Sequence, residues 1–143
     1  MKKNNGFTLI ELLVSISIIA ILTVIASVSF AKAQKNGRDQ RRIDDLKSIQ
    51  NAAEQYFLLS GNYPAVGNYR PNLNWTINNQ VILNKFPSDP KNIGVGITYS
   101  ITNTSTAGYC VCANIENSKN SNAEDQQCGF SNGGDYFCVK NQQ

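Results

Sequence analysis

The chain contains no histidine, and this absence limits the chemistry that it can perform. Histidine is the commonest general base and the commonest metal ligand, and it activates the nucleophile in Ser-His and Cys-His pairs. The adjacent carboxylates Asp44 and Asp45 are a poor substitute, because neighbouring residues on a helix do not face each other. We therefore expect a protein that is not an enzyme and needs no cofactor.

A surplus of charge of one sign is also lacking. The 143 residues include 13 Lys and Arg against 10 Asp and Glu, and removal of a leader with Lys2 and Lys3 would bring the two counts almost level. Such a balance argues against a dedicated nucleic-acid-binding protein.

Charge is scarcest in residues 7–31, where Glu11 is the only ionisable side chain. A helix of this length, at about 1.5 Å per residue, can cross the ~30 Å hydrocarbon core of a membrane. A secretory signal peptide is the alternative, with Ala31-Lys32-Ala33 as its cleavage site. However, the run is longer than the usual ~7 to 15 apolar residues. A carboxylate in a membrane helix is also costly, which indicates a function for Glu11.

The residues that lead into this run follow a specific order. Lys2 and Lys3 are followed by Gly6-Phe7-Thr8-Leu9-Ile10-Glu11 and then by the apolar stretch. This order resembles the leader and mature start of type IV pilins and of the pseudopilins of type II secretion. The resemblance implies that a membrane prepilin peptidase cleaves between Gly6 and Phe7 and methylates the new amine of Phe7.

The same resemblance implies that Glu11 acts in assembly, by meeting the Phe7 amine of a neighbouring subunit. A cation and a carboxylate in apolar surroundings each cost less free energy when they pair. The expected function is a structural subunit of a type IV pilus-like filament. Its expected partners are copies of itself in a helical homopolymer, an inner-membrane assembly platform and ATPase-driven machinery. The alternatives are the major pseudopilin of a type II secretion or DNA-uptake system and, in another class, a membrane-anchored surface binding module.

The charges that flank the apolar run disagree with this topology. Two basic residues precede the run, and five follow it: Lys32, Lys35, Arg38, Arg41 and Arg42. Basic residues are enriched on the cytoplasmic side of a membrane helix, so this count taken alone would place the larger domain in the cytoplasm. The leader motif and the cysteines favour the opposite orientation. We expect a single-pass precursor in the cytoplasmic membrane, in contact with lipid and with its head outside, that later enters an extracellular or periplasmic filament.

A second helical pattern continues beyond the apolar run. Apolar residues spaced by three and four extend it without proline to Ser60, and Gly61 is expected to cap it. The sequence therefore predicts a leader at 1–6, a membrane or filament-core half-helix at 7–31, an amphipathic half-helix at 32–60 and a globular head at 61–143. Charges at ion-pair spacing in the second half, such as Lys35 with Asp39, favour a solvated or subunit-facing surface over a nucleic-acid or lipid-headgroup site.

The head is predicted to contain a small antiparallel sheet. Alternation of apolar residues predicts strands over 93–101 and 109–115, joined by a loop at 102–108, and a third strand over 135–140. Residues 75–85 could hold one short helix or one strand. The expected fold class is α+β, with a long N-terminal helix packed on a small antiparallel sheet, as in pilins.

All four cysteines lie in the predicted head: Cys110, Cys112, Cys128 and Cys138. An even number in an exported domain predicts two disulfides. Cys110 and Cys112 share one face of a strand at a separation of about 6.5 Å, so each should pair with Cys128 or Cys138. We favour the nested pairing, Cys110 with Cys138 and Cys112 with Cys128. The alternatives are a zinc site of four thiolates, for which the spacing is poor, and a reduced cytoplasmic domain.

Three acidic residues of the head are weak candidates for calcium ligands, because Ca²⁺ binds clustered oxygens: Glu124, Asp125 and Asp135. Their spacing is not regular, and ordinary solvated loop carboxylates are favoured. The expected number of bound metals is therefore zero.

Overall fold

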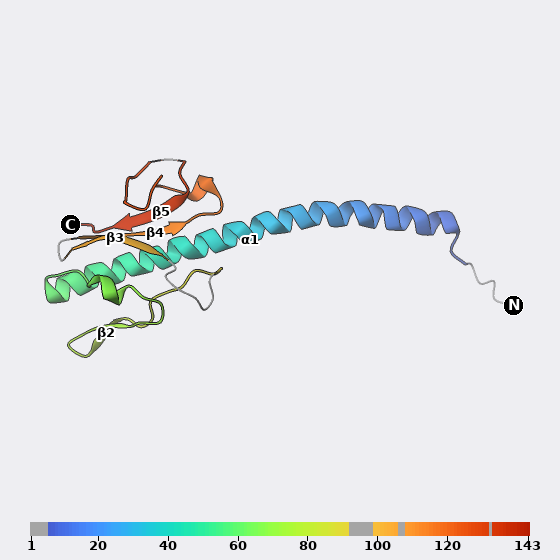
Figure 1. Cartoon of the computed structure of the whole chain (residues 1–143). Helices are drawn as coiled ribbons and strands as arrows, with labels where there is room; N and C mark the ends of the chain where they lie inside the picture. The colour runs from blue at the N-terminus through green and yellow to red at the C-terminus, as the bar shows by residue number, and fades with distance from the viewer. Residues whose placement is uncertain (1–5, 92–98, 106–107, 132) are drawn as a thin grey trace. The chain divides into compact units, whose positions relative to one another are not determined.

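The computed structural model describes residues 6–91, 99–105, 108–131 and 133–143. The chain divides into two compact units, Met1–Gln34 and Lys35–Gln143, and helix α1 (Leu9–Ser60) contributes residues to both (Figure 1).

In the first unit, α1 is apolar on all sides and its large side chains are exposed. Phe7 is 85% exposed, and the large apolar residues from Leu9 to Phe30 are 46% exposed or more. By length and composition this helix could cross a membrane. A helix with apolar side chains on every face needs an apolar environment around it, which lipid or other apolar helices can supply.

In the second unit, α1 buries a narrow stripe of residues at helical spacing: Asp39, Arg42, Ile43, Leu46, Ile49, Ala52 and Ala53. The intervals of three and four keep these side chains on one face. The helix ends where Gly61 adopts a φ of +73° and its N–H donates to the Phe57 carbonyl at 2.7 Å. The predicted glycine cap is confirmed, since this left-handed conformation suits a residue without a Cβ.

A three-stranded antiparallel sheet packs on this part of α1. Its order is β3 (Ser100–Ser105), β4 (Gly108–Asn114) and β5 (Tyr136–Lys140). The third predicted strand and the α+β class are therefore confirmed. Most of the strand predicted over 93–101 lies outside the described residues. The predicted loop at 102–108 is wrong, because β3 continues to Ser105 and pairs with Gly108 of β4.

A two-stranded hairpin, β1 (Trp75–Ile77) and β2 (Gln80–Leu83), replaces the single element expected at 75–85. The two residues between the strands, Asn78 and Asn79, have φ values of +50° and +63°. Two positive φ values in succession are typical of the type I′ turn that joins tight hairpins, and asparagine tolerates that conformation well. Short 3₁₀ helices occupy Val66–Asn68 (η1) and Ser118–Asn120 (η2).

The core of the second unit joins α1, the hairpin and β4 through aromatic side chains. Tyr69, Trp75 and Phe86 are almost completely buried, and their ring centroids lie 5.0 to 6.0 Å apart. The Trp75 indole N–H donates to the carbonyl of Asn68 at 2.8 Å. Both faces of β4 are buried, with Val111 against the aromatic core and Cys110 and Cys112 under the segment that leads into β5.

Candidate functional site

The first candidate site is the start of α1. Gly6 and Phe7 precede the helix and are exposed, so the peptide bond predicted to be cleaved lies outside regular structure. Thr8 occupies the N-cap position: its backbone N–H and its hydroxyl donate to Glu11 Oε2 at 2.9 and 2.8 Å, and the Glu11 N–H lies 3.3 Å from Thr8 Oγ1. This is a capping box, in which two residues satisfy each other's free backbone donors.

Four other polar side chains of the apolar segment are hydroxyls that bond within the helix. Ser15, Ser17, Thr23 and Ser27 donate to carbonyl oxygens three or four residues earlier. Such internal bonds lower the cost of placing a hydroxyl in an apolar medium. Glu11 is therefore the residue of this segment whose charge calls for a partner from elsewhere.

A second site, in the second unit, is a buried network of charges around Arg42. Its guanidinium contacts Asp39 at 2.9 Å, Asp89 at 2.7 Å and Glu116 at 3.1 Å, and Arg38 also binds Glu116 at 2.7 Å. The expectation that this charged part of the helix is a solvated or subunit-facing surface is wrong for Asp39 and Arg42, which are 0% and 3% exposed. Their partners are distant in sequence, so helix spacing alone did not reveal them.

Asp39 binds Arg42, and it also binds the backbone of the segment that follows β4. Its two carboxylate oxygens accept the backbone N–H groups of Glu116 and Asn117, each at 2.9 Å. Hydrogen bonds from Arg38, followed by those from Lys91 and Arg42, hold the pKa of Glu116 far below its usual range, although burial opposes this. The network joins α1 to the segment that contains Asp89 and Lys91 and to the segment that contains Glu116. We interpret it as a structural ion-pair network that holds these segments together.

The cysteines form two disulfides, Cys110 with Cys128 and Cys112 with Cys138, at Cα separations of 6.0 and 4.1 Å. The nested pairing that we favoured is wrong. The register of the sheet gives the reason: Cys112 lies directly opposite Cys138, whereas Cys110 lies opposite Lys140. A directly opposed pair of strand residues is close enough to bond, and Cys110 then pairs with Cys128 from the loop.

The three calcium candidates do not converge. Asp125 accepts the backbone N–H groups of Gln127 and Gly129 within its own turn, and Glu124 and Asp135 are exposed. Within the residues that the structure describes, the side chains that come together as possible metal ligands are instead the four cysteines.

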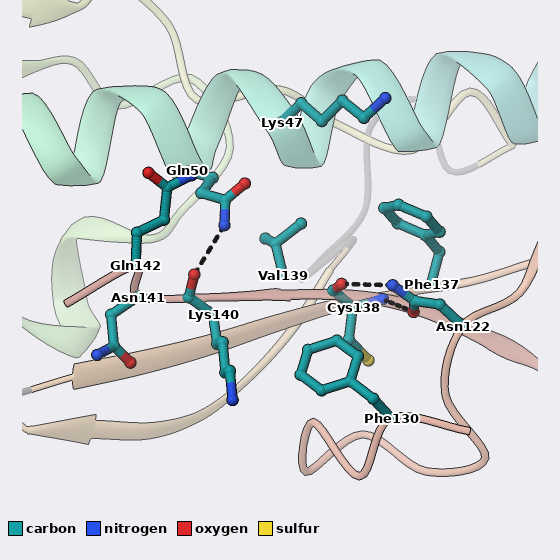
Figure 2. Close-up of a pocket in the computed structure, with 10 residues that line it drawn as sticks. All are labelled: Lys47, Gln50, Asn122, Phe130, Phe137, Cys138, Val139, Lys140, Asn141 and Gln142. Carbon is teal, nitrogen blue, oxygen red and sulfur yellow. Dashed lines mark hydrogen bonds between the residues drawn. The ribbon is translucent and has the colours of Figure 1, made fainter. Parts of the chain in front are cut away.

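A pocket of about 500 Å³ opens between α1, β5 and the loop before β5 (Figure 2). Two of the lining side chains form hydrogen bonds with the backbone of β5. Gln50 donates to the Lys140 carbonyl at 2.8 Å, and the Asn122 amide both donates to and accepts from the backbone of Cys138. These side chains occupy backbone groups on the outer edge of β5, and such groups could otherwise pair with another chain. The ten lining residues include no carboxylate, so this pocket offers no acid–base pair for catalysis.

Comparison with known proteins identifies the first site. Residues 1–27 match the model of the prokaryotic N-terminal methylation motif. The start of the chain therefore carries that motif. The chain is also 35% identical over 66 residues to the type IV major pilin protein PilA of Myxococcus xanthus, a match that covers 46% of this chain and 30% of that pilin. The match thus spans less than a third of the length of that curated relative. No solved structure matches.

The motif and the relative agree with the pilin resemblance of the sequence. They also agree with the expectation that the chain is not an enzyme, because a pilin is a structural subunit. The motif together with an exposed apolar helix fits a membrane-anchored precursor that polymerises. The first site could be predicted from the sequence because its motif lies within a few adjacent residues. The Arg42 network could not, because the partners Asp89 and Glu116 are distant in the sequence.

Proposed function

We propose that this chain is a subunit of a type IV pilus-like filament, matured by a prepilin peptidase and assembled through the N-terminal part of α1. The observation that carries the proposal is the methylation motif at residues 1–27, together with the apolar run of residues 7–31, in which Glu11 is the one acidic residue. In this proposal residues 1–6 are the leader, residues 7–31 form the membrane anchor and later the filament core, residues 32–60 form the amphipathic half of the helix, and residues 61–143 are the displayed head.

The geometry at the start of α1 supports specific roles for three residues. Cleavage between Gly6 and Phe7 would place a free amine one residue before the capping box. Both described side-chain contacts of Glu11 use Oε2, which leaves Oε1 to receive the Phe7 amine of a neighbouring subunit. A charge pair inside a bundle of apolar helices fixes the stagger of the subunits, because every other register leaves two charges without partners.

The match to a major pilin favours a pilus over the pseudopilus of a secretion or DNA-uptake system. In the pilus case the filaments would be extracellular, the head would face outward from the cytoplasmic membrane before assembly, and the platform and ATPase-driven machinery would add subunits from the membrane. A pseudopilus would use the same N-terminal chemistry and remain in the periplasm.

The test uses three variants in the native host, analysed by intact mass and by electron microscopy of sheared filaments. Gly6→Leu should remain at full length in the membrane. Glu11→Val should be cleaved and methylated at Phe7 but should form no filaments. Ser17→Val is the matched control, because it removes a polar side chain from the same helix without removing charge, and it should assemble normally.

Each outcome bears on a different part of the proposal. A mature chain that starts at Gln34 would indicate signal-peptidase cleavage and would overturn the filament function. Normal filaments from Glu11→Val would remove the role of Glu11 but leave the cleavage site intact. Filaments found only in the periplasm would replace the pilus with a pseudopilus.

A further inference from the structure

The four cysteine sulfurs lie closer together than two independent disulfides require. All four Sγ atoms are within 4.8 Å of one another. The Sγ atoms of Cys110 and Cys112, which belong to different disulfides, are 3.6 Å apart. Two of the cysteines come from β4, one from the loop before β5 and one from β5 itself, so the fold gathers them from three segments.

These dimensions are close to those of a tetrathiolate metal site. With a metal–sulfur distance of about 2.3 Å, the sulfurs of a tetrahedral site lie about 3.8 Å apart. A disulfide holds its two sulfurs about 2.05 Å apart, so each bonded pair must open to about 3.8 Å after reduction, which is a movement of roughly 0.9 Å per sulfur that side-chain rotation can supply. Cys110, Cys112 and Cys138 are at most 2% exposed, as in a closed structural site, and the partly exposed Cys128 provides an entrance.

We propose that the reduced head is a binding site for Zn²⁺ or a similar soft divalent ion, with all four cysteines as ligands. The same sulfurs then have two states, two disulfides when oxidised and one metal centre when reduced. Both states hold the loop that contains Cys128 against β4. The proposal concerns the head alone and stands whether or not the chain forms a filament.

A phosphine reductant converts the two disulfides into the four thiols that bind the ion. Each disulfide accepts two electrons and gives two thiols, while one phosphine becomes a phosphine oxide with oxygen taken from water. The four thiols release four protons as they bind the ion, which gives a centre with a net charge of −2. A peroxide reverses the change: two molecules accept four electrons and four protons, yield four waters, restore both disulfides and release the ion.

Backbone carbonyl oxygens lie close to three of the four sulfurs. The carbonyl oxygens of Gln126, Asp125 and Val139 lie 3.7, 3.5 and 3.4 Å from the Sγ atoms of Cys110, Cys138 and Cys128, respectively. A carbonyl oxygen accepts a hydrogen bond from a thiol but repels a thiolate. Binding of the metal ion to the reduced head displaces the thiol protons, which are released to the solvent.

A metal titration can test the proposal. The chain has no histidine, so the commonest nitrogen ligand cannot compete with the cysteines for the ion. Untagged full-length protein in a nonionic detergent is reduced with a phosphine under nitrogen and titrated with Co²⁺. We expect one equivalent to bind with the sulfur-to-cobalt charge-transfer bands and intense visible bands of a tetrahedral thiolate site. One equivalent of Zn²⁺ should displace it, and the oxidised protein should bind none.

Two controls make the outcome decisive. Cys128→Ser should weaken Co²⁺ binding by more than about tenfold and change its spectrum. Trp75, the single tryptophan, is 2% exposed and its fluorescence reports whether the reduced head is folded. The proposal is overturned if the reduced protein shows no charge-transfer bands at one equivalent, if Cys128→Ser gives the same spectrum, or if the reduced head unfolds and the metal does not restore it.

Discussion

Arg42 binds both carboxylate oxygens of Asp89, which lies 47 positions further along the chain, with Nε–Oδ2 and Nη2–Oδ1 distances of 2.7 and 3.0 Å. Both side chains are at least nine-tenths buried. A two-pronged contact of this kind is strong and directional, because the planar guanidinium matches the carboxylate. It fastens the head turn that contains Asp89 to the helix.

Replacement of Arg42 by methionine should therefore strongly destabilise the head. The variant keeps most of the side-chain volume but leaves Asp39 and Asp89 without their buried cation. Breaking a buried ion pair in this way costs about 3 to 5 kcal/mol. Urea unfolding of the detergent-solubilised protein, followed by the fluorescence of Trp75, measures the change.

The matched control for this variant is Arg41→Met. Arg41 is the neighbouring residue and is exposed, so the same change of side chain there should alter the free energy of unfolding by less than about 0.5 kcal/mol. An equal decrease in the free energy of unfolding in the two variants would show that the buried contacts of Arg42 do not stabilise the head.

The stability of the head should fall in acid because of Glu116. Hydrogen bonds from Arg38, Lys91 and Arg42 hold its pKa below the unfolded value of 4.5. Between those two pKa values the unfolded chain binds more protons, so the contribution of Glu116 is complete above about pH 4.5 and is lost as the pH falls below it. Urea midpoints measured from pH 7 to pH 3 should decline, and Glu116→Gln should have a lower midpoint at pH 7 and a flatter decline.

Asp45 provides a control of opposite sign. Burial raises its pKa above 3.8, although the hydroxyl of Tyr99 donates to it at 2.6 Å. The folded state favours the protonated form of Asp45. The stability that this preference contributes is present at low pH and is lost as the pH rises through the folded pKa. Asp45→Asn should therefore make the acid decline steeper. A flatter decline in this variant would contradict the assignment.

Position 134 requires glycine because the backbone of Ala123 and Glu124 lies too close to it to leave room for a side chain. A Cβ at this position would overlap the backbone of Ala123 and Glu124. Gly134→Ala should therefore cost at least 1 to 3 kcal/mol, roughly the cost of overpacking, because backbone atoms cannot move aside as a side chain can. Gly67→Ala is the control, since a Cβ there meets nothing within 4 Å, and thermal unfolding compares the two.

The local features of this fold were predictable, and the distant pairings were not. The sequence indicated α1, Gly61 and the third strand, because periodicity and capping act within a few residues. The disulfide pairing depends on the register of β4 with β5. The pattern within each strand decides only which side chains share a face, and the exact pairing involves residues far apart in the sequence. The Asn78-Asn79 turn was a missed local signal, because two adjacent asparagines favour successive positive φ values.

Two neighbouring tyrosines should respond differently to the loss of their hydroxyl groups. The Tyr109 hydroxyl lies 3.3 Å from Glu54 Oε1, whereas the buried Tyr69 hydroxyl has no hydrogen-bond partner among the described residues. A buried polar group without a partner costs about 1 to 3 kcal/mol. Tyr69→Phe should therefore raise the urea midpoint, and Tyr109→Phe should lower it. Similar losses in both would show that Tyr69 has a partner.

The capping box should determine how firmly the first turn of α1 is held. Thr8→Val keeps the shape of the side chain but removes the hydroxyl that contacts Glu11. Loss of an N-cap costs about 1 kcal/mol, so amide hydrogen exchange in this turn should become roughly fivefold faster in detergent micelles.

Thr23→Val and Thr8→Ser separate the cap from a general loss of hydroxyl groups. The Thr23 hydroxyl bonds to the carbonyl of Ala20 inside the helix, so its removal should leave exchange at residues 9–12 unchanged. Thr8→Ser retains the capping oxygen and should exchange at the original rate. In the proposed mature chain Thr8 is the second residue, and the cap then holds Glu11 through Oε2 so that Oε1 can receive the Phe7 amine of a neighbouring subunit. Exchange in Thr8→Val at the original rate would mean that the carboxylate is positioned by something other than Thr8.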